Sequence, residues 1–420
     1  MSPEEKPARV DARAAGRERL LAKFQGCLVG GAAGDALGYP VEFMTDAGIR
    51  DAYGPRGIRG YELGAGRCAE ISDDTQMTLF TANGLLIGDT RSRLGEAGRP
   101  SWRCCSETYR DWLYTQDHDY GGSPGVSWLL GVDALHSRRA PGGTCLGAIR
   151  GGMGSVEEPV NDSKGCGGVM RVAPVGLFWA NRRSTGERDR LLLEHVVDEA
   201  ARCAALTHGH PLGYISAGAM AYIVCRCASE APVGCKDPGE ALLGIICDCQ
   251  DGLLRWFPGQ RDHAAFQADL LGRACKLAVA GRHGDDEIER LGEGWVGEEA
   301  LAMGVYASLR HPTNFSAAIR LAVNHSGDSD STGSICGQIV GALLGLGAIG
   351  SEWTDRLELR DVIMEVARDL CVGCQTDEHG ECRDERWAEK YARIPGRSEA
   401  RTAPRPGGGR CDIDTGCRPG

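Results

Sequence analysis

The chain has 420 residues, of which 42% are hydrophobic and 25% are charged, and these proportions are typical of a globular protein. Its formal net charge of −11 makes a general nucleic-acid-binding function unlikely, because phosphate contacts need an excess of Lys and Arg. The 19 cysteines do not predict a disulfide framework, since most lie in apolar helical runs and the first residues show no signal-peptide pattern. We therefore expect a cytoplasmic protein.

Apolar residues recur at helical spacing along most of the chain, after a polar segment (residues 1–18) that we expect to be disordered. One helical pattern runs from Arg19 into the motif GDALGYPVEF, and another begins at ISDDTQM. Further helical patterns cover residues 102–113, 189–207, 211–229, 239–257, 264–280, 298–310 and 314–325. Few segments alternate with a period of two. The sequence therefore predicts an all-α domain over residues 19–372.

In chain order, the first candidate ligands are two acids in the segment Gly30–Phe43. Asp35 ends an apolar helix, where it caps the helix or pairs with another group. Glu42 follows on a loop, where an acid can reach a ligand. Taken singly, each of these residues is more typical of a structural or solvated acid than of a catalytic one.

The second candidate is the helix start at Ser72, where Asp73 and Asp74 are adjacent. Acids at a helix N-terminus interact favourably with the helix dipole, by about 0.3–1 kcal/mol each. Taken alone, the segment is therefore also explained by helix stability.

A glycine-rich segment, Asn161–Arg171, is the third candidate. Its glycines leave backbone N–H groups free to approach an anion, and Arg171 would add positive charge. It lacks the Gly-Lys-Ser/Thr order of a P-loop, and a tight turn competes equally as an explanation. Downstream, THGHP offers two histidines, of which His210 better fits a turn at a helix end. The candidate substrate-binding residues are Gly165, Gly167, Gly168, Met170, Arg171 and His208.

The last acidic segment, residues 328–332, precedes a helix of small residues. It carries Asp328, Asp330 and Ser331, with two further hydroxyl residues, although a helix cap needs one such side chain. If this segment meets the helix start at Ser72, four carboxylates come together and their repulsion demands cations. Carboxylate and hydroxyl oxygens are the ligands that suit Mg²⁺ or Mn²⁺.

The same helix carries glycines at positions 333, 337, 341 and 345, which share one face. A stripe of this kind lets another backbone approach closely. It also resembles a membrane dimer motif, but the apolar run of residues 335–349 is too short to cross a bilayer. We expect no membrane span.

The composition changes after Cys371, and we expect residues 373–420 to form a tail without a packed core, because they are charged and then rich in Pro, Gly and Arg. One alternative is a zinc clip formed by Cys371, Cys374, His379 and Cys382. The spacing after the histidine is short for a zinc knuckle.

Five motifs in this order, GDALGYPVEF, ISDDTQM, SKGCGGVMRVAP, THGHP and GDSDSTGSICGQIVGALLG, resemble the ADP-ribosylglycohydrolase family over about residues 19–370. The resemblance implies a compact orthogonal bundle of helices around a central dinuclear Mg²⁺ or Mn²⁺ site. It implies the metal ligands Ser72, Asp73, Asp74, Asp328, Asp330 and Ser331. It also implies a catalytic role for an acid among Asp73, Asp74 and Glu42.

The function that this resemblance implies is hydrolysis of the bond between ADP-ribose and a modified protein side chain. The Asp-Ser-Asp-Ser form of the last motif is closer to the arginine-directed branch of the family. The alternatives are hydrolysis of other ADP-ribose conjugates (O-linked, free or nucleic-acid-linked) and a catalytically silent ADP-ribose-binding protein. We expect a monomer that acts on an ADP-ribosylated protein or another ADP-ribose conjugate.

Overall fold

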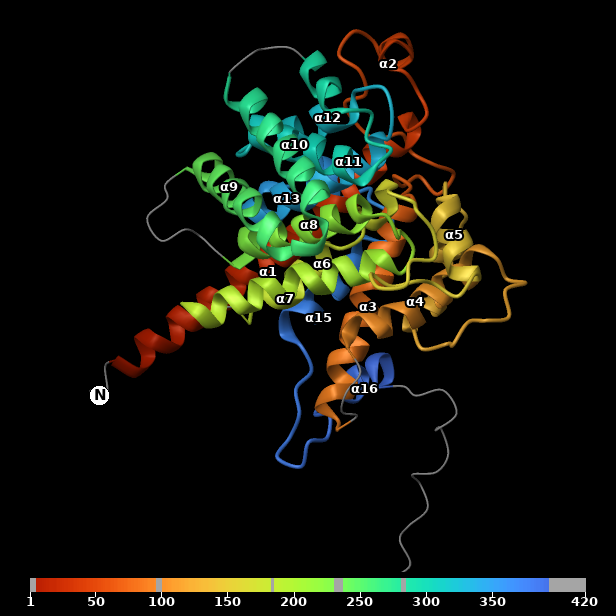
Figure 1. The fold of residues 1–420 in the computed structure, drawn as a ribbon. Helices are drawn as coiled ribbons and strands as arrows, with labels where there is room; N and C mark the ends of the chain where they lie inside the picture. Colours follow the sequence, from red (N-terminus) through yellow and green to blue (C-terminus); the bar gives the residue numbers. More distant parts are fainter. Residues whose placement is uncertain (1–4, 96–99, 183–184, 230–236, 281–284, 393–420) are drawn as a thin grey trace, which may run out of the picture.

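The protein is an assembly of α-helices, which Figure 1 shows for a computed structural model. The structure describes residues 5–95, 100–182, 185–229, 237–280 and 285–392. The longer helices are α1 (Glu5–Gly38), α3 (Asp73–Arg93), α4 (Ser101–Gln116), α7 (Glu187–Ala205), α8 (Pro211–Ser229), α9 (Pro238–Trp256), α10 (Arg261–Val279), α11 (Gly297–Arg310), α13 (Ser329–Leu344) and α15 (Arg360–Val372). The shorter ones are α2 (Asp46–Tyr53), α5 (Gly143–Arg150), α6 (Ala173–Ala180), α12 (Phe315–Val323), α14 (Ser351–Thr354) and α16 (Glu385–Tyr391).

The all-α prediction is confirmed, because no β-strand forms within the described ranges. The helical patterns found in the sequence coincide with α4 and α7–α12 to within about one turn at each end. Several helices were missed, among them α5 and α6. Helix α5 has two glycines among its eight residues, which lowers its helix propensity. Helix α6 is apolar on all sides, so it has no amphipathic period to detect.

Helices α1 and α13 pack against each other through two stripes of glycine. A Cβ atom on Gly337 would lie 1.9 Å from the carbonyl oxygen of Gly30, and one on Gly34 would lie 1.9 Å from that of Gly333. The close approach predicted from the stripe on α13 is therefore confirmed. Its partner is a second stripe on α1, at residues 26, 30, 34 and 38, which the sequence analysis did not recognise.

The α1–α13 pair is covered by other helices. Helices α8, α11 and α12 pack against α13, and α15 and α12 pack against α1. Among the described helices, α8 alone is long and apolar enough to cross a membrane, but 89% of its apolar window is buried inside the protein. Contacts with α6, α7, α9 and α11 account for that burial.

The N-terminal helix starts earlier than expected. Residues 1–18 were predicted to be disordered, whereas α1 begins at Glu5 and continues without a break to Gly38. Ala and Arg recur in residues 8–19, and both residues have high helix propensity. Figure 1 shows this end of α1 extending away from the other helices.

The packed chain also continues beyond residue 372. The Trp387 indole on α16 donates a hydrogen bond to Thr90 Oγ1 of α3 (2.9 Å), and the Tyr391 hydroxyl donates to Asp369 Oδ2 of α15 (2.8 Å). Both aromatic side chains are buried. The prediction of an unpacked tail is therefore wrong for residues 385–391, while residues 393–420 lie outside the described ranges.

The zinc alternative has no support in the described part of the tail. Cys374 is buried, whereas the His379 imidazole is largely exposed and lies 3.5 Å from the Glu378 carboxylate. Among the described residues, these four side chains are not a group whose ligand atoms all lie within 4.8 Å of one another.

Candidate active site and metal centre

The two acidic segments, which are about 250 residues apart in the chain, meet at the N-termini of α3 and α13. Each segment caps its own helix: Ser72 Oγ accepts a hydrogen bond from Asp74 N (3.2 Å), and the Asp328 carboxylate accepts one from Ser331 N (3.3 Å). The Ser331 hydroxyl then donates to Asp74 Oδ1 across the two helices (3.4 Å). The capping explanation is thus correct, and the two caps also form a single cluster.

Glu42 belongs to the same cluster. It follows the 3₁₀ turn Tyr39–Val41 at the end of α1, and its side chain is directed inward and is only 8% exposed. Carboxylate oxygens of Glu42, Asp328 and Asp330 all lie within 4.8 Å of one another. Three segments that are distant in sequence therefore bring their acids to one buried place.

Burial raises the pKa of four acids at this place, Glu42, Asp73, Asp74 and Asp330. Loss of hydration is the larger cause, and the charge of neighbouring carboxylates adds to it. The pKa of Glu42 rises to about 9 and that of Asp73 to about 8. The pKa values of Asp74 and Asp330 also lie well above their usual range. A bound cation would reverse this effect, because positive charge stabilises the ionised carboxylates.

The donor set fits a hard divalent cation. Glu42 Oε2 and Asp74 Oδ2 are buried and have no hydrogen-bond partner among the described residues. A buried polar atom without a partner costs about 1–3 kcal/mol, so such atoms call for an ion or a water molecule. Carboxylate and hydroxyl oxygens, with no sulfur or imidazole ligand in the group, suit Mg²⁺ or Mn²⁺.

Asp35 positions the start of α3 and was not recognised as part of the site. Its buried carboxylate accepts hydrogen bonds from Ser72 N (3.0 Å), Thr75 N (3.1 Å) and the Thr75 hydroxyl. Burial raises the pKa of Asp35 to about 6, although these hydrogen bonds lower it in part. The sequence left capping and pairing open, and the structure shows an acid of α1 that caps the N-terminus of α3.

The glycine loop lies beside the acid cluster. Gly167 and Gly168 form a 3₁₀ turn with Cys166, and Gly165 precedes it. The loop is held by backbone hydrogen bonds from Cys166 N to the carbonyl oxygen of Trp295 (3.2 Å) and from Gly297 N to that of Lys164 (2.8 Å). Burial raises the pKa of the Cys166 thiol, and the carboxylates of Asp328 and Asp74 raise it further. This thiol therefore faces the acid cluster, a position that the sequence analysis missed.

Arg171 does not face the cluster, contrary to the prediction that its charge would hold an anion. Its guanidinium is fully buried and donates to Tyr109 Oη (3.0 Å), Thr207 Oγ1 (2.7 Å) and the carbonyl oxygen of Gly167 (2.8 Å). These donors are therefore already used inside the protein. Met170 is likewise a core residue, and its carbonyl oxygen accepts a hydrogen bond from Gln338 Nε2 (3.0 Å). The guanidinium therefore stabilises the glycine loop through its hydrogen bond to the carbonyl oxygen of Gly167.

His208 lies against the glycine loop. A Cβ atom on Gly167 would lie 2.9 Å from His208 Cε1, and His208 Nδ1 is 2.8 Å from Thr207 Oγ1. Burial lowers the pKa of His208 to about 3, and the charge of Arg171 contributes. The imidazole is therefore neutral. His210 fits the simpler turn interpretation, since its Nδ1 accepts a hydrogen bond from Leu212 N at the start of α8 (3.1 Å).

The model of the ADP-ribosylglycohydrolase family matches residues 16–380 of the chain. The chain belongs to the ADP-ribosylglycohydrolase family. The part of the chain that matches the family model runs from α1 to α15 and includes every acid of the cluster. The resemblance stated from the five motifs is therefore confirmed, and membership supports an ADP-ribosyl glycohydrolase activity in general.

The chain is also similar to three curated members of known name. It is 25% identical over 358 residues to ADP-ribosylarginine hydrolase Tri1 of Serratia proteamaculans, with 83% of this chain and 79% of that protein covered. It is 24% identical to ADP-ribosyl-[dinitrogen reductase] glycohydrolase of Rhodospirillum rubrum (82% and 93% covered) and 23% identical to human ADP-ribosylhydrolase ARH3 (82% and 91%). A solved ADP-ribosylglycohydrolase-related protein complex matches with a TM-score of 0.53 and 25% identity, covering 84% of this chain and 99% of that one.

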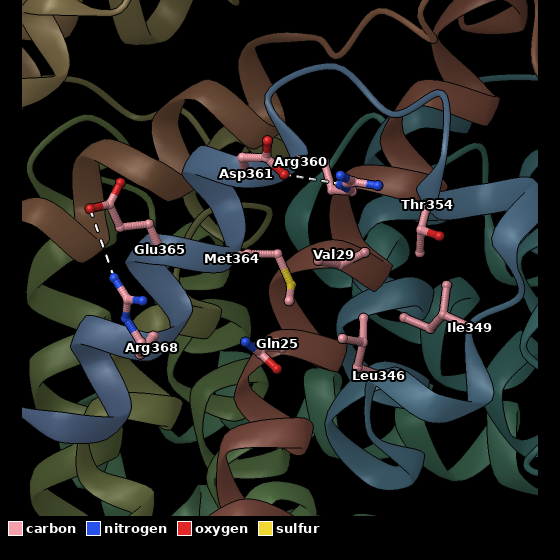
Figure 2. A pocket seen from close by; sticks show the side chains of 10 residues that line it. All are labelled: Gln25, Val29, Leu346, Ile349, Thr354, Arg360, Asp361, Met364, Glu365 and Arg368. Atoms are coloured by element: carbon pink, nitrogen blue, oxygen red, sulfur yellow. Dashed lines mark hydrogen bonds and ion pairs between the residues drawn. The ribbon is translucent and has the colours of Figure 1, made fainter.

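A separate cavity of about 590 Å³ lies between α1 and α15 (Figure 2). Gln25 and Val29 of α1 line it together with Met364 of α15, and the charged side chains of Glu365 and Arg368 stand at its side. None of the acids of the ADP-ribosylglycohydrolase motifs lines this cavity. It is therefore distinct from the acid cluster.

Proposed function

We propose that the protein is a metal-dependent hydrolase that removes ADP-ribose from the arginine side chain of a modified protein. The observation that carries this proposal is the cluster of Glu42 with the acids of two helix N-termini, in which two buried carboxylate oxygens lack a partner among the described residues. Capping needs no such surplus of buried charge, whereas a cation site does.

The acids and hydroxyls of the cluster would hold two Mg²⁺ or Mn²⁺ ions. Bound there, the ions would supply the positive charge that orients the vicinal hydroxyls of the ribose and polarises the reacting bond. The proposed ligands are Ser72, Asp73, Asp74, Asp328, Asp330 and Ser331, with Glu42 beside them.

The chain's own residues supply the proton transfer. The candidates are Asp73, Asp74 and Glu42. Asp73 Oδ2 accepts from Gly142 N (3.2 Å) and Asp74 Oδ1 accepts from the Ser331 hydroxyl (3.4 Å), while Asp74 Oδ2 and Glu42 Oε2 accept no hydrogen bond from any described residue. A general base needs a free oxygen within reach of the water that it activates. Glu42 and Asp74 have such an oxygen, and Asp73 stays the third candidate.

Backbone N–H groups of Gly167 and Gly168 are the proposed partners of the diphosphate, whereas Gly165 N already donates to Ser163 Oγ (3.3 Å). The Arg171 guanidinium, in contrast, acts on this loop only through the carbonyl oxygen of Gly167. A diphosphate at this loop would be bound by backbone dipoles, not by a cationic side chain.

The arginine linkage is proposed on two grounds. The motif Asp328-Ser329-Asp330-Ser331 is closer to the arginine-directed branch of the family, and a relative that covers most of the chain is named an ADP-ribosylarginine hydrolase. Release of ADP-ribose from arginine-, serine- and nucleotide-linked conjugates, assayed with full-length protein and Mg²⁺, tests this linkage. We expect the arginine conjugate to be cleaved fastest and the Asp74→Asn variant to be inactive. No release from the arginine conjugate would refute the proposal.

A further inference from the structure

Two exposed aromatic rings stack on each other at the acid cluster. The rings of Phe43 and Trp295 have centroids 5.6 Å apart and planes inclined by 21°. Phe43 is 75% exposed and Trp295 is 37% exposed, while most other large apolar side chains of the described chain are buried. Core packing does not explain a pair that is open to solvent. A ligand that presents a flat face would explain it.

Phe43 is held in place by the turn that buries Glu42. Glu42 points into the cluster with Asp328 and Asp330, and the next residue presents its ring to the outside. Met44 N donates to the carbonyl oxygen of Val41 (2.9 Å), and Asp46 N donates to Ser326 Oγ (3.0 Å). Hydrogen bonds therefore hold the backbone around Phe43, which is the residue next to Glu42 in the chain.

Trp295 comes from a strap, residues 292–296, that joins the two halves of the site. Asp328 N donates to the carbonyl oxygen of Glu293 (2.8 Å), and Cys166 N of the glycine loop donates to that of Trp295 (3.2 Å). Gly294 has φ +83°, and a Cβ atom there would lie 3.4 Å from Asp328 Cβ. The indole is thus carried by backbone that touches the metal-binding helix start on one side and the glycine loop on the other.

The pair of rings suits a planar cation. The negative π faces of the two rings attract positive charge. A guanidinium is flat, always charged and weakly hydrated, so it stacks on aromatic faces well. In an ADP-ribosylated arginine the guanidinium is bonded directly to the reacting ribose. The adenine is separated from that ribose by a diphosphate and a second ribose.

We propose that Phe43 and Trp295 form a platform that binds the guanidinium of the arginine leaving group and sets the preference for arginine over serine conjugates. This inference rests on the proposed function, because it names the leaving group of that reaction. The platform is open to solvent, as it must be for a side chain that is still attached to a protein.

Variants that remove the π face but keep apolar bulk test the platform: Phe43→Leu and Trp295→Leu, with Phe43→Tyr and Trp295→Phe as variants that keep a ring. Phe266→Leu serves as the matched control, because Phe266 is 52% exposed on α10. We expect kcat/KM for the arginine conjugate to fall about tenfold in the Leu variants. We expect the serine conjugate and the calorimetric Kd of free ADP-ribose to change less than about twofold. The ring-keeping variants should retain more kcat/KM for the arginine conjugate than the Leu variants, and Phe266→Leu should resemble wild type.

Weakened binding of free ADP-ribose in the Leu variants would show that the pair holds adenine and would overturn the proposal. Equal losses for both conjugates, or no loss, would also overturn it. Binding of methylguanidinium, followed by ligand-observed NMR with Mg²⁺ present, requires no turnover. Wild-type protein should bind it and the Leu variants should not, even if the arginine conjugate proves not to be the substrate. If wild type does not bind methylguanidinium, the platform is refuted independently of the proposed function.

Discussion

At the scale of single residues, Arg171 shows how burial changes the role of a charged side chain. We predict that Arg171→Met lowers the free energy of unfolding by about 3 kcal/mol or more, because it leaves the carbonyl oxygen of Gly167 and the hydroxyls of Tyr109 and Thr207 without their donor. Urea unfolding measures this change. Arg103→Met is the control, since Arg103 is exposed. Unchanged stability together with lost ADP-ribose affinity would instead place the guanidinium at the ligand.

His208 gives a prediction about acid stability. Its pKa is lowered from 6.5 to about 3, so the folded imidazole stays neutral where the unfolded one takes up a proton. The contribution to stability is complete above pH 6.5 and declines as the pH falls toward 3. Between pH 7 and pH 5 the wild type should lose about 2 kcal/mol more than His208→Gln. Parallel urea titrations at both pH values measure the difference, and identical losses would contradict it.

At the scale of elements, the glycine stripes make a prediction with a built-in control. Gly337→Ala would place a Cβ atom 1.9 Å from a backbone oxygen of α1, so the helices must separate, and we expect a loss of at least about 3 kcal/mol in unfolding free energy. Gly244→Ala on α9 meets no atom within 4 Å and should stabilise by up to about 1 kcal/mol, since alanine favours the helix. Similar thermal shifts for both variants would refute the close packing.

Helix positions and the glycine stripe of α13 were predictable because both are periodic along the sequence. Other features were not. Helix α6 is apolar on every side, and the stripe on α1 has meaning only opposite its partner. Burial of Arg171 was missed for a related reason, because a cation beside glycines is equally compatible with a ligand and with the neutral partners that it has in the fold.

At the scale of the whole molecule, the end of the packed chain is also testable. A chain ending at Gly373 lacks α16, whose Trp387 and Tyr391 are buried against α3 and α15. We predict that this truncation lowers the unfolding free energy by about 3 kcal/mol or more, whereas a chain ending at Ala392 keeps full-length stability and activity. Calorimetric melting of both chains measures this. Equal melting temperatures would show that α16 contributes no stability.

The local sequence patterns identified the two acidic helix starts. They could not predict the contact between them, because no residue near Ser72 indicates that Asp328 lies beside it. The resemblance to the family supplied the expectation that the two segments meet. In the structure, the hydrogen bond from the Ser331 hydroxyl to Asp74 joins them. No sequence pattern indicated that Asp35, Cys166 and Trp295 lie at the site. Their roles depend on distances that only the folded chain sets.

The central claim is that these distant acids form one cation-dependent catalytic centre. The most direct measurement is ADP-ribose release from an arginine conjugate by full-length protein, first in excess chelator and then after addition of Mg²⁺ or Mn²⁺, with Asp330→Asn assayed in parallel. We predict no release in chelator, recovery with either metal for the wild type and no recovery for the variant, because Asp330 lies in the acid cluster. Full activity in excess chelator would contradict the account.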